Sequence, residues 1–138
     1  MVETPSRKVR PQYRNINAFK DLTTYRLPLA GWVSILHRVS GALMFLLLPL
    51  VVWLFDRSIT SEISFVSFQN AVSHWFVKLI LLGLIWAYLH HFIAGVRHLW
   101  MDAFHTVTKQ QGTQSAVVTL GLSLALTAVF ALKLFGAF

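Results

Sequence analysis

Three long apolar stretches dominate this sequence of 138 residues, at about residues 29–55, 74–100 and 115–136. A helix needs about 20 apolar residues to cross the hydrocarbon of a bilayer, and its backbone groups are then hydrogen-bonded within the helix. Only 12% of the residues are charged, whereas an average soluble domain has about 25%. The sequence therefore predicts an all-α membrane protein with three transmembrane helices.

Two prolines and two polar segments set the expected limits of these helices. Pro28 suits a helix start, where its missing N–H costs nothing, and Pro49 should kink the first span. Residues 1–28 are polar and are expected to form an irregular segment before a transmembrane domain over residues 29–138. Residues 56–73 and 101–114 are expected to be polar connections between the spans.

The distribution of positive charge predicts the orientation in the membrane. Six of the twelve lysines and arginines lie in the first thirty residues, and the 56–73 connection holds Arg57 alone. Because Lys and Arg accumulate on the cytoplasmic side, the N-terminus and the 101–114 connection are expected to be cytoplasmic.

The net charge of +7 comes without a groove-reading motif, so no nucleic-acid partner is expected. The lack of cysteine excludes disulfides and thiolate metal sites.

Ionisable residues inside membrane spans are costly and suggest a functional site. With the predicted orientation, Ser34, His37 and Arg38 lie in the cytoplasmic half of the first span, and His98 lies at the cytoplasmic edge of the second. His91 precedes residue 100 by nine residues, which places it about 14 Å deeper at 1.5 Å per residue. Polar groups from two spans are therefore expected in one leaflet.

His91 is a candidate haem ligand, because neutral imidazole commonly ligates haem iron. Ala87 and Gly95 share its helical face, and such small residues would let a flat macrocycle approach the backbone. His90 points about 100° away and is a second candidate. Alternatively, both histidines form hydrogen bonds between helices, and the small residues are ordinary helix contacts. The other two spans carry no histidine near mid-membrane, so a second axial ligand would come from another chain.

Ser34 and Arg38 lie four residues apart on one face of the first span. A hydroxyl and a guanidinium in this arrangement can bind a quinone carbonyl or a haem propionate. Alternatively, Ser34 bonds to its own helix and Arg38 reaches lipid phosphate. His37 and His98 are candidates for the propionate region, or interfacial residues. Arg97 is expected to be an interfacial anchor.

Three motifs resemble the cytochrome b membrane-anchor subunit of succinate dehydrogenase. They are YRLPL at residues 25–29, SILHRVSG at residues 34–41 and HFIAGVRHLWMD at residues 91–102. The resemblance extends over all three spans and the spacing between them. It implies a three-helix subunit that forms half of a heterodimeric helical anchor bundle with a second hydrophobic anchor subunit. The two anchors would bind one haem b and hold the iron–sulfur subunit and the flavoprotein subunit at the cytoplasmic face.

The resemblance also assigns residues. It implies that His91 is this chain's axial ligand to the haem iron, that His37 and Arg38 approach the haem propionates, and that Ser34 and Arg38 line a ubiquinone site. The expected function is thus that of a membrane anchor of succinate:ubiquinone oxidoreductase in a bacterial inner (cytoplasmic) membrane, with succinate oxidised on another subunit. The alternatives are the anchor of a fumarate reductase and a non-catalytic structural or assembly protein.

Overall fold

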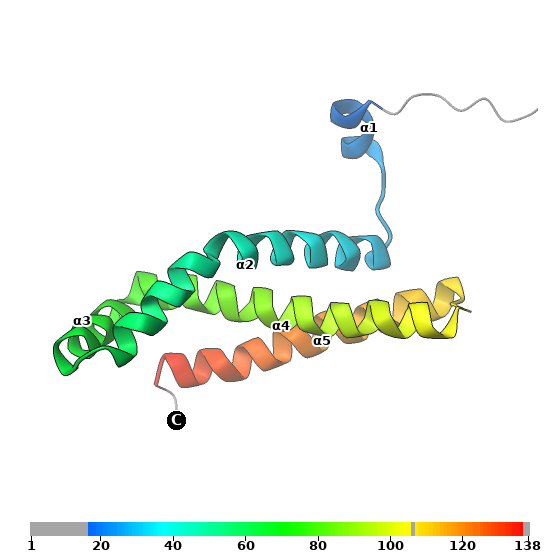
Figure 1. The fold of residues 1–138 in the computed structure, drawn as a ribbon. Coiled ribbons are helices and arrows are strands. Elements are labelled where there is room, and N and C mark those ends of the chain that lie inside the picture. The colour runs from blue at the N-terminus through cyan, green and yellow to red at the C-terminus, as the bar shows by residue number, and fades with distance from the viewer. Residues whose placement is uncertain (1–16, 106, 137–138) are drawn as a thin grey trace, which may run out of the picture.

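The computed structural model describes residues 17–105 and 107–136, which form helices and short connections without a strand (Figure 1). Helix α1 spans Ala18–Thr24, α2 Leu29–Ile59, α3 Glu62–Ser73, α4 Trp75–Phe104 and α5 Lys109–Leu134. Helices α2, α4 and α5 contain 31, 30 and 26 residues, and each is long and apolar enough to cross a membrane. The expected all-α membrane fold with three spanning helices is confirmed.

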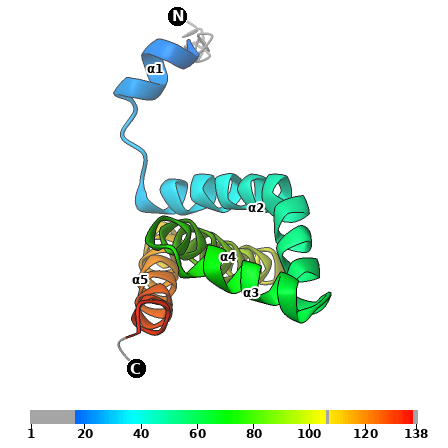
Figure 2. The ribbon, with the colours of Figure 1, turned by 90° about the vertical axis from the view of Figure 1, so that its left-hand side faces the viewer.

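The two prolines act on α2 as expected. The helix begins directly after Pro28, and Pro49 lies inside it. Figure 2 shows α2 turning sharply partway along its length. A proline inside a helix removes one backbone hydrogen bond and its ring crowds the preceding turn, so Pro49 accounts for a bend in an otherwise continuous helix.

Two segments that were expected to lack regular structure are partly helical. Helix α1 lies within residues 1–28, and the Asn17 side chain caps it by accepting hydrogen bonds from two backbone N–H groups. Helix α3 fills most of the 56–73 connection and begins with a reciprocal cap between Ser61 and Ser64. The 101–114 connection is also shorter than expected, because α5 begins at Lys109. Side-chain caps decide these helix starts, and hydropathy does not detect them. The expectation for residues 1–16 lies outside the described residues.

Small residues form the contacts between the spanning helices, and α4 packs against both α2 and α5. Val33, Ala94 and Ala116, one from each spanning helix, form the buried core. Such residues let helix backbones approach closely, which favours association inside a membrane. Large apolar side chains point outward instead: Phe45 on α2 is 74% exposed and Leu99 on α4 is 70% exposed. These side chains are available to lipid or to another membrane chain.

Candidate functional site between α2 and α4

Three of the predicted site residues meet between α2 and α4. The rings of His37 and His91 stack with their centroids 4.2 Å apart and their planes 10° apart. His98 lies two turns beyond His91 on α4, and its ring tilts against His37 with a centroid distance of 5.1 Å. Residues that are distant in the sequence therefore form one cluster of imidazoles.

Each ring of the stacked pair lies over a glycine of the opposite helix. A Cβ at Gly41 on α2 would lie 2.7 Å from Cε1 of His91, which is closer than real Cβ contacts. A Cβ at Gly95 on α4 would lie 3.4 Å from Nε2 of His37, which is near ordinary contact. The position of the His91 ring therefore requires glycine at position 41. A methyl group at position 95 would fit beside His37 with little or no displacement.

Of the two roles left open for the small residues near His91, ordinary helix contact fits Ala87. Ala87 is 4% exposed, whereas Gly95 is only partly buried and lies against the ring of His37. Ala87 therefore packs α4 within the chain. Helical periodicity identifies residues that share a face, but it does not say whether that face is turned inward or outward.

A hydrogen bond fixes the tautomer of His91. Its Nδ1 lies 2.9 Å from the carbonyl oxygen of His37 and 3.4 Å from the hydroxyl of Ser40. A carbonyl oxygen only accepts hydrogen bonds, so Nδ1 carries the proton and donates it. The neutral ring then has its free lone pair on Nε2, which makes no hydrogen bond among the described residues. An N–H held by a carbonyl opposite a free ring nitrogen is typical of metal-ligating histidines.

His90 lies in a different environment from its neighbour. Its side chain is 0% exposed, and its ring stacks on that of Trp86 with a centroid distance of 5.3 Å. Both of its ring nitrogens are buried without a hydrogen-bond partner in the described part of the chain. A ligand bound outside the three helices cannot reach His90 without moving α4, whereas His91 is only partly buried.

Ser34 and Arg38 remain available on α2, one turn apart and on either side of His37 in the sequence. Ser34 is half-buried and Arg38 is exposed, and neither side chain makes a hydrogen bond or an ion pair among residues 17–105 and 107–136. Ser40 behaves differently, because its hydroxyl donates to the His37 carbonyl at 2.9 Å. The structure thus does not place Ser34 in the backbone hydrogen bond that was the alternative to a ligand-binding role.

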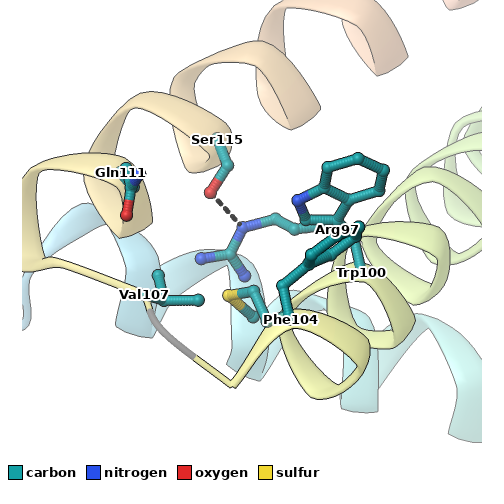
Figure 3. Close-up of a pocket in the computed structure, with 7 residues that line it drawn as sticks. Arg97, Trp100, Phe104, Val107, Gln111 and Ser115 are labelled. Carbon is teal, nitrogen blue, oxygen red and sulfur yellow. Dashed lines mark hydrogen bonds between the residues drawn. The ribbon is translucent and has the colours of Figure 1, made fainter.

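Arg97, which was expected to be an interfacial anchor, is only 8% exposed and lies between α4 and α5. This burial was not predicted from the sequence. Its Nε donates to the Ser115 hydroxyl at 2.9 Å (Figure 3). Its Nη2 donates to the Gly112 carbonyl at 3.1 Å. The polar residues at the start of α5 could have indicated this position in advance, because a buried arginine needs hydrogen-bond partners of this kind.

A large apolar cavity lies between the spanning helices, and none of the three clustered histidines lines it. Its volume is about 510 Å³, and residues of α2, α4 and α5 line it, including Met44, Leu84 and Phe130. Tyr88, one turn before His91 on α4, lines the cavity at its end nearest to the cluster. Such an apolar space can accept a hydrophobic group.

Comparison with known proteins adds an independent observation. The chain matches the family model "Succinate dehydrogenase/Fumarate reductase transmembrane subunit" over residues 10–130. It is 34% identical over 117 residues to the succinate dehydrogenase cytochrome b556 subunit of Paracoccus denitrificans, covering 85% of this chain and 89% of the relative. It is 35% identical over 105 residues to the subunit of the same name from Coxiella burnetii, covering 75% and 83%. The match to the Rickettsia bellii subunit is 31% over 81 residues.

The family model spans most of the chain, and the two longest alignments cover most of both partners. The three spanning helices fit a membrane subunit of an enzyme complex. The residues of the histidine cluster all lie within the matched region. This chain therefore belongs to the succinate dehydrogenase/fumarate reductase transmembrane subunit family.

Proposed function

We propose that this chain is the cytochrome b membrane anchor of a succinate:ubiquinone oxidoreductase, with His91 as an axial ligand to haem b. The observation that carries this proposal is the orientation of His91, whose Nδ1–H is held by the His37 carbonyl while Nε2 has no partner among the described residues. The relatives are named cytochrome b556 subunits, and a b-type cytochrome name implies haem b. Haem b supplies a one-electron redox centre when bound.

The residues around His91 fit this role. The carbonyl of His37 orients the imidazole and increases its basicity as a ligand, as outer partners of metal-bound histidines do. His37 and His98 lie in the same cluster, and Arg38 follows His37 on α2. Together they provide hydrogen-bond donors and a positive charge for the haem propionates. His91 would hold the haem iron together with a residue of a second anchor subunit.

Ser34 and Arg38 are proposed to bind ubiquinone. A serine hydroxyl can donate to a quinone carbonyl oxygen, and a guanidinium stabilises negative charge that develops on that oxygen as electrons arrive. The electrons would come from succinate through the flavoprotein and iron–sulfur subunits, and two electrons with two protons convert the quinone to quinol. Both side chains lack hydrogen-bond partners among the described residues, so a substrate would satisfy them.

The surfaces of the chain support an assembly with other subunits. Apolar side chains of α2 are exposed along much of its length, which would suit a second hydrophobic anchor and the bilayer. Figure 1 shows α1 standing away from the three long helices. With the N-terminus on the cytoplasmic side, α1 and the exposed Tyr25 would lie where the iron–sulfur and flavoprotein subunits are proposed to dock. The bacterial inner membrane is the proposed location.

Substitutions in the quinone site test the proposed function. Ser34→Ala and Arg38→Leu are expected to lower succinate:ubiquinone reductase activity of the purified complex by about 5- to 160-fold, because a lost hydrogen bond to a substrate costs about 1–3 kcal/mol. Succinate oxidation with an artificial dye acceptor should remain unchanged, since the dye accepts electrons before the quinone. The measurement is the ratio of the two activities in each variant.

The matched controls are Ser58→Ala and Arg57→Leu, which change the same residue types at the opposite end of α2. Their activity ratio should equal that of the unmodified complex. An equal loss of both activities in the Ser34 and Arg38 variants would show failed assembly and would contradict a quinone-binding role.

A further inference from the structure

The pocket around Arg97 is separate from the histidine cluster. It lies on the side of α4 that faces α5, whereas His91 packs against α2. Figure 3 shows the guanidinium reaching from α4 toward α5, with the rings of Trp100 and Phe104 beside it. No step of the proposed electron transfer uses this region.

Arg97 brings a buried positive charge without a negative partner. Its hydrogen bonds go to the neutral Ser115 hydroxyl and the neutral Gly112 carbonyl, and no carboxylate of the described residues pairs with it. A guanidinium has five N–H donors, and Nη1 makes no hydrogen bond in the described part of the chain. A buried cation at membrane depth is costly until an anion joins it.

The cavity at the guanidinium is large enough for such an anion. Its volume is about 290 Å³, far more than the ~10–15 Å³ that one water needs. None of the side chains that line it is acidic. Gln111 also lines it, and the carboxamide oxygen of Gln111 is already used by Thr108, which leaves the amide N–H groups to donate. Gln111 lies in the first turn of α5, where the helix dipole is positive. The dipole therefore adds to the attraction of the cavity for an anion.

The depth and the lining of the cavity indicate which anion fits. Arg97 lies seven residues before the end of α4, or about 10 Å at 1.5 Å per residue. A helix of 30 residues is about 45 Å long, which matches a bilayer including its headgroups, so Arg97 lies near the boundary between headgroups and hydrocarbon. Trp100 and Phe104 are 65% and 56% exposed, and such aromatic rings favour that boundary.

From these observations we infer that the Arg97 pocket binds the phosphate group of an anionic phospholipid. The guanidinium and the Gln111 amide donate hydrogen bonds to the phosphate oxygens. Met101 and Val107 provide apolar contacts for the glycerol and the first carbons of the acyl chains. A free phosphate ion shares the charge but would gain nothing from these apolar and aromatic side chains.

Phospholipid retention in the purified complex tests this inference. The unmodified complex, washed extensively in detergent, should keep a phospholipid that native mass spectrometry detects, and titration with phosphatidylglycerol in mixed micelles should raise its Tm. Arg97→Gln should lose the retained lipid and bind phosphatidylglycerol at least tenfold more weakly. Arg97→Lys should keep part of the affinity, because it keeps the charge but loses the planar fork. The control Arg57→Gln removes one exposed arginine elsewhere and should match the unmodified complex.

A second measurement covers the case in which Arg97→Gln does not assemble. A photoreactive phosphatidylglycerol with its label near the headgroup should crosslink to peptides containing Met101 or Phe104 in the unmodified complex. Equal lipid retention in Arg97→Gln and Arg57→Gln would overturn the inference. A rise in Tm with millimolar inorganic phosphate alone, as large as the rise with the lipid, would also overturn it. So would a crosslink, formed with a carboxyl-reactive reagent, between the pocket and a carboxylate of a partner subunit when the photoreactive lipid gives none. None of these results depends on the haem or on quinone reduction.

Discussion

Replacement of His91 by leucine is expected to abolish haem b binding, whereas the same replacement of His90 should leave it intact. The physical reason is the difference between the two environments. His91 has its Nδ1–H held by a backbone carbonyl and its Nε2 without a partner among the described residues, while His90 is 0% exposed. Reduced-minus-oxidised spectra and haem content per purified complex measure the effect. The two variants control for each other, because they remove the same group from adjacent positions on one helix.

The same pair also predicts opposite effects on stability. The ring nitrogens of His90 are buried without hydrogen bonds in the described part of the chain, so they carry a desolvation cost that leucine would not have. His90→Leu should therefore keep or raise the Tm of the complex, while His91→Leu should lower it by losing the ligand that binds the folded state. Haem loss in His90→Leu with haem retention in His91→Leu would move the ligand by one residue and refute the assignment.

Gly41→Ala is expected to displace His91 and to change or remove the haem signal. The new Cβ would lie 2.7 Å from Cε1 and 3.1 Å from Nδ1 of His91, so the ring must turn away from the His37 carbonyl. Overpacking of this kind typically costs about 1–3 kcal/mol. We expect a shifted spectrum and a haem content reduced severalfold in the purified complex.

Gly95→Ala is the matched control for this prediction. It adds the same methyl group to the same interface, but its Cβ would lie 3.4 Å from His37, and the rest of its surroundings are open. Its haem content should stay close to that of the unmodified complex. If Gly41→Ala and Gly95→Ala gave the same spectrum and haem content, the close fit between Gly41 and His91 would not support ligation.

The fold was largely predictable from the sequence. Hydropathy gave three spans, and the observed helices lie within a few residues of them except where α4 and α5 extend into the 101–114 connection. The short helices α1 and α3 were not predicted, because Asn17 and Ser61 start them through local hydrogen bonds. A hydropathy profile averages over such single caps and does not register them.

The candidate site was predictable in part. The sequence correctly predicted that His37, His91 and His98 lie near one another, because antiparallel spans place the start of the first helix beside the end of the second. The sequence left open whether Ala87 and Gly95 face a macrocycle or another helix, and the burial of Arg97 was not predicted. Both depend on the rotation of α4 about its axis, and periodicity does not define that rotation.

By itself the sequence determined the membrane fold, because a bilayer leaves the backbone almost no alternative to apolar helices that satisfy their own hydrogen bonds. It also indicated the family, through motifs at residues 25–29, 34–41 and 91–102, and the family model matches residues 10–130. The tertiary structure alone decided which of two adjacent histidines is buried and which has a ring nitrogen without a hydrogen-bond partner among the described residues. It did so through close contacts of small residues such as Gly41 and Ala94, which set how α4 is turned between α2 and α5. The same rotation buries Arg97 against α5 and creates the pocket proposed to bind lipid.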